Sequence, residues 1–243
     1  MPLLDESAFK TFLTNKRVVI VGPASTIEGS GQGSLIDSYD VVVRVNRAVS
    51  HLGGKAVDIG TRTDILYACM STERVNQFHP RTKKLEVDVD LWVHNKVRVV
   101  SEVYPRGESF YRASIAHNVY QVLQDDRVNL RHLPNENYFK VKEKVGCHLN
   151  SGLVALTDLL THDIRELYIT GIDFHRSIYM EGYETFTKES MKDMFENRSS
   201  HDPDKQFQYF KYEIFQKDDR VKVDEPLREF LMDPKYEKTI DKG

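Results

Sequence analysis

Two short stretches of this chain combine polar side chains with glycine in a way that suits phosphate binding. In the first, the apolar segment Val18–Val21 runs into a glycine-rich loop, and a second apolar segment, Val41–Val45, ends on Asn46. In the second, Asn150 introduces a segment whose apolar residues have helical spacing. Glycine-rich loops after a strand and the N-termini of helices both present backbone N–H groups that bind anions. The sequence therefore predicts a nucleotide-binding site made from these two stretches.

The elements that must hold these residues alternate along the chain between strands and helices. Apolar runs and turn residues predict strands at 17–21, 40–45, 64–68, 90–94, 128–133 and 166–171. Helices are expected at 5–15, 34–38, 112–124 and 150–162, and in the more polar tail at 187–196, 203–216 and 224–232. This alternation predicts an α/β fold, with a single Rossmann-like domain and a mostly parallel central sheet flanked by helices. Ligands of such sheets bind beyond the carboxyl ends of the strands.

The bulk composition favours one globular domain and argues against several kinds of partner. The 243 residues suffice for one sizeable domain, and no Pro/Gly/Ser-rich linker divides them. A formal net charge of -3 gives no electrostatic case for nucleic acid as a partner. No apolar run approaches the roughly 18–20 residues of a membrane span, and two cysteines fit a reducing compartment. We therefore expect a cytoplasmic or otherwise soluble protein, with no transmembrane segment in this chain.

The glycine-rich stretch resembles the large sialylmotif of family 29 sialyltransferases. From Gly22 to Ala48 it follows the pattern G-x6-GSGxG-x-x-IDSxDxVxRxNRA without a gap, and D-x-G-x-R-T follows at 58–63. The loop does not fit other nucleotide motifs. A dinucleotide fingerprint needs glycine at Ser34, and no Gly-Lys-Ser/Thr follows as a P-loop requires. An NAD-linked oxidoreductase is therefore disfavoured.

The resemblance to the large motif implies where the donor nucleotide is held. The nucleotide contacts it implies are Gly22, Ser25, Asn46 and Arg47. The family usually has an asparagine directly after the first glycine, where this chain has Pro23. The contact made by that asparagine is therefore expected to be missing here, or moved to Ser25.

Residues 148–171 resemble the small sialylmotif of the same family, in which a polar triplet with glycine opens a helix that leads to a strand. Glycine in the triplet lets an anion approach the backbone, and the helix N-terminus adds the positive end of its dipole. Taken alone, such a triplet is also an ordinary helix cap. With the resemblance, we expect the triplet Asn150, Ser151 and Gly152 to stabilise the donor's phosphate. Gly171, at the end of the following strand, is expected to belong to the same site.

His201 and Gln206 resemble the family's very small motif, a histidine followed after four residues by glutamate. In the family this histidine is the catalytic base, so the resemblance implies that His201 takes the proton of the acceptor hydroxyl. The position of the glutamate holds Gln206, which leaves open which group orients the imidazole. The candidates in the sequence are Asp202, Asp204 and Glu213.

A third motif of the family, rich in histidine and tyrosine, is matched only loosely, by His175 with Tyr179 and Tyr183. His175 follows a predicted strand end, where functional residues of open sheets collect. We expect it to be an additional donor to the leaving phosphate. The alternative is that His175 is an ordinary histidine of a solvent-facing loop.

Several acidic residues invite a metal-site interpretation that we do not adopt. Asp88 and Asp90 have the Asp-x-Asp form of metal-dependent sugar transferases. We interpret them as exposed acids at the start of a strand, because the resembled family uses a monophosphate donor and needs no metal. Asp37, Asp40 and Asp58 are expected to hold turns and backbone rather than to do chemistry.

By this resemblance, the chain is predicted to be a CMP-sugar-dependent glycosyltransferase of the GT-A variant type. It would move sialic acid from CMP-sialic acid to a hydroxyl of a glycan acceptor, inverting the anomeric centre without a metal or other cofactor. CMP-Kdo is the alternative donor, and a non-catalytic CMP-binding module is the alternative class. We expect one domain over 1–243, with a donor-binding core at about 16–175 and the base and acceptor elements in 176–243. Animal family members are anchored in the Golgi, so an excised domain is the alternative to a cytoplasmic protein.

Overall fold

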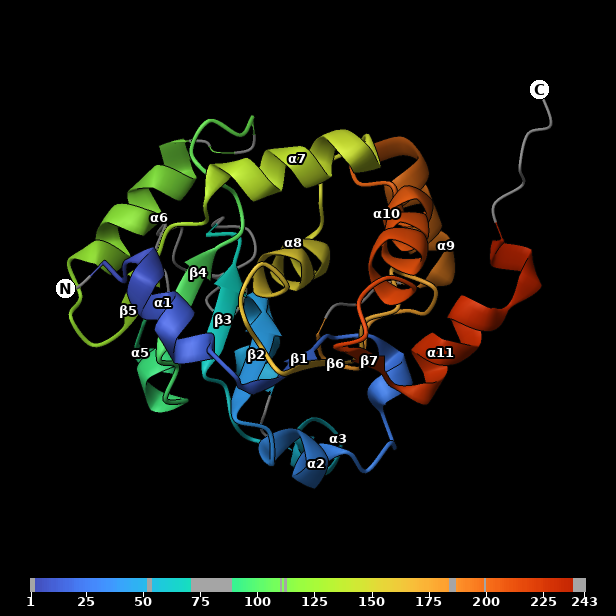
Figure 1. The fold of residues 1–243 in the computed structure, drawn as a ribbon, viewed down its shortest axis with the longest axis horizontal. Helices are drawn as coiled ribbons and strands as arrows, with labels where there is room; N and C mark the ends of the chain where they lie inside the picture. Colours follow the sequence, from blue (N-terminus) through green and yellow to red (C-terminus); the bar gives the residue numbers. More distant parts are fainter. Residues whose placement is uncertain are drawn as a thin grey trace.

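The chain folds around a parallel β-sheet, seen in a computed structural model that describes residues 3–51, 54–70, 89–109, 111, 113–183, 187–198 and 200–237 (Figure 1). Within these residues seven strands form one sheet, in the order β5-β4-β3-β2-β1-β6-β7. They are β1 (Arg17–Val21), β2 (Val41–Val45), β3 (Ile65–Ala68), β4 (Val99–Glu102), β5 (Asn129–Arg131), β6 (Glu166–Thr170) and β7 (Val221–Val223). The chain runs outward from β1 to β5 and then returns to place β6 beside β1. The switch point, where open α/β sheets bind ligands, therefore lies between β1 and β6.

The central strands are mostly apolar because the sheet is covered on both faces. Along β1, Val18 belongs to one hydrophobic core and Val19 to the other. Such continuous apolar runs are typical of parallel strands buried on both sides. All pairings are parallel, and Val21 of β1 is level with Arg44 of β2 and Thr170 of β6. These three strands therefore end together, and the loops that follow them meet at one edge.

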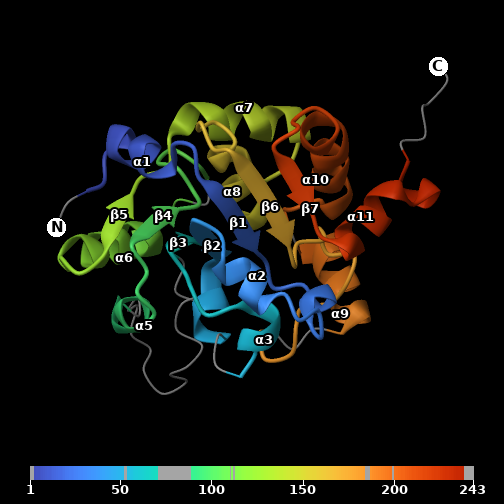
Figure 2. The same ribbon diagram turned by 60° about the horizontal axis from the view of Figure 1, so that its bottom comes forward.

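Helices cover both faces of the sheet (Figures 1 and 2). One apolar core joins the sheet to α1 (Glu6–Leu13), α7 (Asn135–Val145), α8 (Ser151–Leu159), α10 (Pro203–Tyr209) and α11 (Glu225–Met232). The other joins it to α2 (Gly33–Asp37), α3 (Ala56–Ile59), α5 (Val89–His94) and α6 (Ala113–Leu123). A further helix, α9 (Lys188–Asp193), follows the long loop after β6. The predicted class, a parallel sheet between two layers of helices, is confirmed.

Most predicted elements are confirmed to within a few residues, but the strand predicted at 90–94 is wrong. Those residues form α5, in which Trp92 is buried and its neighbours are partly exposed. A strand in this sheet must be buried on both faces, and the next apolar run, β4, meets that requirement at all four residues. Lys96, with a φ of 58°, turns the chain between the two.

Besides β4, the elements α3, α7 and β7 were not predicted. In α7 the buried residues Tyr138, Val141 and Val145 have helical spacing, and Gly146 ends the helix with a φ of 73°. The signal was therefore present but diluted by the many lysines and glutamates of that helix. In the described part of the chain, no helix is long and apolar enough to cross a membrane.

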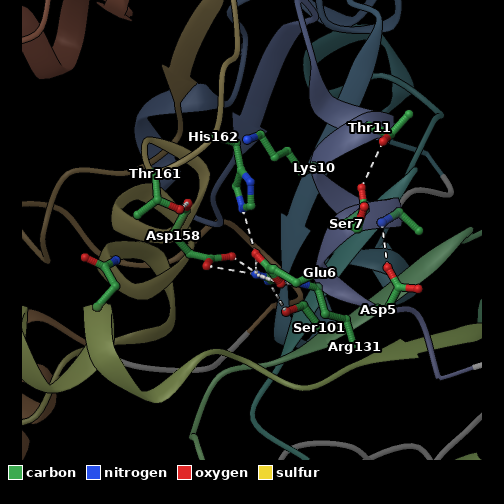
Figure 3. A network of polar contacts seen from close by, with 12 residues as sticks. Asp5, Glu6, Ser7, Lys10, Thr11, Ser101, Arg131, Asp158, Thr161 and His162 are labelled. Carbon is green, nitrogen blue, oxygen red and sulfur yellow. Dashed lines mark hydrogen bonds and ion pairs between the residues drawn. The ribbon is translucent and has the colours of Figure 1, made fainter.

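A buried network of charges fixes the C-terminal half of α8 to the sheet (Figure 3). Arg131 of β5, 1% exposed, lies with its Nη1 2.6 Å from Oδ2 of Asp158 on α8. The same guanidinium pairs with Glu6 of α1 at 2.9 Å, and the hydroxyl of Tyr67 donates to Asp158 at 2.6 Å. Strands β3 and β5 and helices α1 and α8 are thereby joined, which holds the opposite end of α8 at the carboxyl edge of the sheet.

Candidate functional site

A cleft lies at the carboxyl edge of the sheet, where the loops after β1, β2 and β6 meet the start of α8. It encloses about 880 Å³ of space, part of it open to solvent. The cleft brings together residues that are up to 178 positions apart in the sequence, from Pro23 to His201. Those of the predicted site residues that line it are Asn46, Asn150, Ser151, Gly152, Gly171, His175 and His201. The structure thus places most of the predicted site at the switch point of the sheet.

Asn46 ties three elements together at the floor of the cleft. Its Nδ2 donates to Oγ of Ser151 at 2.9 Å, and its Oδ1 accepts from the backbone N–H of Cys69 at 3.1 Å. Asn46 has a φ of 50°, a left-handed conformation that costs free energy for a residue other than glycine. The position directly after β2 therefore depends on this side chain and its two contacts.

The first turn of α8 forms one wall of the cleft. The carboxamide of Asn150 caps the helix, because its Oδ1 accepts from the N–H of Leu153 at 2.8 Å. Ser151 is 7% exposed, and Gly152 follows without a side chain. The N–H groups of a first helical turn have no partner within the helix and carry the positive end of the dipole. This wall is therefore suited to a phosphate or a carboxylate.

The orientation of His201 is set by a backbone carbonyl. Its Nδ1 lies 2.8 Å from the carbonyl oxygen of His148. A carbonyl oxygen only accepts, so Nδ1 of the neutral ring carries the proton and Nε2 is the basic nitrogen. Because the ring lines the cleft, this tautomer is the one that a general base requires.

Gln206 links the histidine to the start of α8 without acting as a charge. It is fully buried, and its Oε1 accepts from the N–H of Asn150 at 2.8 Å. Its Nε2 donates to the same His148 carbonyl at 3.4 Å. Gln206 and His201 therefore share one acceptor, which answers the question left open by the missing glutamate.

The three carboxylates considered as supports for His201 have other contacts. Asp202 caps α10 by accepting from the N–H of Lys205 at 3.0 Å. Asp204 lies 2.8 Å from Nη2 of Arg176. The remaining candidate, Glu213, lies 2.9 Å from Nζ of Lys217. The carbonyl of His148 is the group that the geometry assigns to Nδ1.

Glu108 anchors the loop that carries this carbonyl. Its buried carboxylate accepts from Nζ of Lys142 at 2.8 Å and lies 3.3 Å from Nδ1 of His148. Burial acts to raise the pKa of Glu108, but hydrogen bonds from Lys142 and Ser109 outweigh it and lower that pKa to about 2. Burial and the charge of Lys142 lower the pKa of His148. The ion pair that fixes this loop is therefore that of Glu108 with Lys142.

Aromatic rings form the wall opposite α8. The centroid of the His175 ring lies 4.4 Å from that of Phe195 and 5.6 Å from that of Tyr179. Tyr183 lies 5.2 Å from Tyr179, so the three residues of the loosely matched motif are neighbours. His175 has a φ of 63° and follows Phe174 at 53°. Two successive left-handed residues other than glycine are a costly backbone feature of the kind that gathers at functional sites.

Gly22 acts on the cleft through packing rather than by lining it. A Cβ on Gly22 would lie 2.3 Å from the carbonyl oxygen of Gly171, and one on Gly171 would lie 2.5 Å from that of Gly22. The missing side chains let the turns after β1 and β6 come together. Asp224 holds the second turn by accepting from the N–H of Gly171 at 3.0 Å.

Ser25 and Arg47 do not line the cleft either. The N–H of Ser25 donates to the carbonyl of Ile178 at 2.9 Å, and the guanidinium of Arg47 lies 5.2 Å from the centre of the Tyr183 ring. Both support the loop that forms the aromatic wall. Their contacts with a nucleotide stay predictions.

The glycine-rich loop itself is not an open anion site. The N–H groups of Gly29 and Gly31 both donate to the carboxylate of Asp58 at 2.9 Å, and these two hydrogen bonds lower its pKa. Asp37 likewise accepts from the N–H groups of Thr61 and Arg62. The N–H groups of Gly29 and Gly31 are thus taken up by the chain itself, and the prediction that Asp37 and Asp58 hold turns and backbone is confirmed.

Asp40 also serves the backbone, accepting from the N–H of Arg17 at 2.7 Å. Asp90 lies exposed in α5 with its Oδ1 2.8 Å from Arg127, while Asp88 lies outside the described residues. Among the described residues, no cluster of histidine, cysteine and carboxylate side chains is arranged to hold a metal ion.

Sequence reasoning missed Asp173, which lines the cleft and is 4% exposed. It accepts from the N–H of Ser177 at 2.8 Å and from the hydroxyl of the same residue. Burial raises the pKa of Asp173, although these hydrogen bonds oppose the shift. Its place just beyond the end of β6 was the available signal, since that is where ligands of such sheets bind.

Part of the sequence matches the model of one protein family. Residues 5–106 match the model of glycosyltransferase family 29 (sialyltransferase). The predicted resemblance to this family is thereby confirmed over the part of the chain that contains the large motif and β1 to β4. A search of curated proteins finds no match to the sequence.

Solved sialyltransferase structures share the fold over most of this chain. A mammalian sialyltransferase is 15% identical with a TM-score of 0.55, and the match covers 91% of this chain and 73% of that one. The same protein solved with Gal-β-1-3GalNAc-ortho-nitrophenol gives a TM-score of 0.55 at 14% identity, with the same coverage. The sialyltransferase CstII from Campylobacter jejuni, in complex with cytidine-5'-monophosphate, gives 0.54 at 14% identity over 86% of this chain and 79% of that one. The GT-A variant fold expected from the resemblance is confirmed.

Proposed function

We propose that this protein is a glycosyltransferase that moves sialic acid from CMP-sialic acid to a hydroxyl group of a glycan acceptor. The family match and the shared fold support this class of enzyme. The observation that carries the proposal is the cleft itself. It joins the capped N-terminus of α8 to the basic nitrogen of His201 at the switch point of the sheet.

The start of α8 is the proposed site of the donor's phosphate. The N–H groups of Ser151 and Gly152 and the hydroxyl of Ser151 would bind the phosphate oxygens, and Asn46 holds that hydroxyl in place. Gly152 leaves room for an anion against the backbone. CMP carries a single phosphate, so these donors can take up the charge of the leaving group without a metal ion.

His201 is the proposed general base. Its Nε2 would take the proton of the acceptor hydroxyl while that oxygen forms a bond to the anomeric carbon of the donor sugar. The bond from that carbon to the phosphate oxygen breaks at the same time, and its electron pair leaves with CMP. A single displacement inverts the anomeric centre. His175 and the neighbouring tyrosines would donate to the leaving phosphate from the opposite wall.

We propose that the donor and the base are held by consecutive parts of the chain. Residues 16–175 supply the donor wall from β1, β2, β6 and α8, and residues 176–243 supply His201 and Gln206. Both parts belong to one sheet, because β7 pairs with β6. The donor sugar is proposed to be sialic acid, and the same test compares it with Kdo.

The test is the release of CMP from CMP-sialic acid and from CMP-Kdo, in the presence of a chelator, by the wild type and by His201→Ala. Slow donor hydrolysis needs no acceptor. We expect the variant to lose about a hundredfold or more in rate while binding CMP as before. His117→Ala, on the exposed side of α6, is the matched control and should be unchanged.

The other outcomes discriminate between the alternatives. Release of CMP from CMP-Kdo but not from CMP-sialic acid would make Kdo the donor sugar in place of sialic acid. Binding of CMP in calorimetry with no release by any variant, with or without glycan acceptors, would favour a non-catalytic CMP-binding module. Failure to bind CMP at all would overturn the proposal.

A further inference from the structure

A second cleft is lined by His201 as well. It is lined by the start of α10, by α9 and by the loop after β6, and it encloses about 1360 Å³, part of it open to solvent. Five residues line both clefts: His175, Ser177, Ile178, Phe195 and His201. A hydroxyl group presented from the second cleft would therefore reach the base, while the donor occupies the first.

Arg176 is held rigidly at the edge of this second cleft. Its side chain is 7% exposed, and its guanidinium carbon lies 4.4 Å from the centre of the Phe207 ring and 4.7 Å from that of Tyr236. One terminal nitrogen, Nη1, donates to the carbonyl of Phe174 at 3.4 Å. A guanidinium packed on two aromatic rings is fixed in its plane, which suits bidentate recognition of two oxygens of an oxyanion.

The remaining edge of this guanidinium has unmet hydrogen-bonding capacity. Among the described residues, Nε and Nη2 of Arg176 have no hydrogen-bond partner although both are buried. Buried donors of this kind are costly to leave unsatisfied. Asp204 places Oδ1 2.8 Å from Nη2, but without the alignment of a hydrogen bond, and its side chain is 82% exposed. Asp204 is therefore a loosely held counterion that can swing into solvent.

We propose that the second cleft is the acceptor site and that Arg176 binds an acidic group on the acceptor sugar, a carboxylate or a sulfate. The inference rests on the proposed function, because it takes His201 as the base. The Nε and Nη2 edge matches two oxygens of such a group, and Asp204 moves aside when it binds. The lining includes Lys188, Lys192 and Lys205 with Arg176, against Glu196, Asp202 and Asp204. Three of these cations pair with the three carboxylates, so the lining carries one excess positive charge, that of Lys188, beside the displaceable pair of Arg176 and Asp204.

The test is binding of three small sugars to the CMP-loaded protein by calorimetry and NMR. The probes are methyl β-D-galactopyranoside, the corresponding galacturonic acid methyl glycoside and galactose 6-sulfate. We expect an acidic probe to bind the wild type about tenfold more tightly than the neutral one. Arg176→Gln should abolish that preference. Asp204→Asn should strengthen binding of the acidic probe at least twofold and leave the neutral probe unchanged.

The control variant is Lys205→Gln, which removes a positive charge from the same cleft at an exposed position. Its effect on the acidic probe should be less than twofold, because a solvated lysine is screened. A larger effect than that of Arg176→Gln would overturn the assignment to Arg176. If Arg176→Gln does not fold, the wild type and Asp204→Asn still decide the question.

Two results would contradict the inference without touching the proposed function. One is equal affinity of the wild type for acidic and neutral probes when CMP binds and CMP-sialic acid is hydrolysed. The other is weaker binding of the acidic probe to Asp204→Asn. Failure of the wild type to bind CMP would instead overturn the proposed function.

Discussion

The two ends of α8 are held by opposite kinds of polar contact. The C-terminal half carries Asp158 into a buried cluster of charges with Arg131 and Glu6 (Figure 3). The N-terminal turn is held by neutral groups, with Asn150 bonded to Gln206 and Ser151 bonded to Asn46. One helix is therefore held by charged groups at its C-terminal end, which we call the anchor, and by neutral groups at its N-terminal end.

The difference follows from what each end has to accommodate. At the anchor, burial acts to lower the pKa of Arg131, but Asp158 and its other acidic neighbours together outweigh burial and raise that pKa above its usual range. Burial raises the pKa of Tyr67 as well, so its hydroxyl stays neutral and donates to Asp158. At the cleft, no carboxylate of the described residues caps the first turn, and the N–H of Leu153 donates to the neutral Asn150. A helix start held by neutral groups can take the charge of a ligand, whereas the anchor is already balanced.

The largest expected effect comes from breaking the anchor. Asp158→Ala would leave Arg131 buried without its main partner, and we expect a loss of about 3–5 kcal/mol in the free energy of unfolding, measured by urea denaturation. The double variant Asp158→Leu with Arg131→Met should recover most of it, since no buried charge remains. Asp126→Asn, on an exposed loop, is the control. A loss below about 1 kcal/mol for Asp158→Ala would show that the cluster is not an anchor.

At the N-terminal end of α8 we expect a large loss of rate and a small loss of stability. Ser151→Ala removes a proposed phosphate donor, so the rate of CMP release should fall about a hundredfold, which corresponds to about 3 kcal/mol of transition-state free energy. The free energy of unfolding should change by about 1 kcal/mol or less, because a single neutral hydrogen bond is lost. If Ser151→Ala lowered the free energy of unfolding by as much as the transition-state free energy, the two ends of α8 would not differ in role.

The contrast also shows which parts of the site sequence reasoning can reach. Asn46 and Ser151 were each predicted from their own surroundings, the end of a strand and the start of a helix. Parallel strands and the helices between them deliver both positions to the same edge, so their contact follows from the fold class. His201 was found through the resemblance alone.

Contacts that depend on how distant helices pack were out of reach. The bonds from Gln206 to His148 and Asn150 exist because α10 packs against α7 and the start of α8. The sequence showed a missing glutamate, but not that a carbonyl takes over the orientation of His201. Similarly, the motif contains both the glycine loop and Asp58, and only the structure shows that they bind each other.

The segment that forms α5 was predicted as a strand because local sequence does not show how distant elements pack. The segments 89–94 and 97–101 both contain closely spaced apolar residues, and local spacing does not say which one enters the sheet. Burial decides it, since β4 is buried at every residue and α5 mainly at Trp92.

A smaller effect on stability is expected at Glu108, which fixes the loop that carries the His148 carbonyl. Its pKa is lowered from 4.5 to about 2, so its ionised form stabilises the fold above about pH 4.5 and that stabilisation is lost as the pH falls toward 2. Glu108→Gln should therefore lower the free energy of unfolding at pH 7 by about 2–3 kcal/mol. The difference from the wild type should shrink between pH 4.5 and 2. Glu136→Gln, an exposed position on α7, should show neither effect.

The smallest and most specific effect is expected from placing a charge where the site is neutral. Gln206→Glu would put a carboxylate beside the carbonyl that orients His201, which favours the protonated imidazole. Because the base must be unprotonated to act, the acidic limb of the kcat/KM profile should move to higher pH by about one unit. Gln206→Met, of similar volume and uncharged, should lower the rate without moving that limb. If the acidic limb of Gln206→Glu coincides with that of the wild type, position 206 does not act electrostatically on the base. The neutral contacts at this end of α8 would then have no bearing on proton transfer.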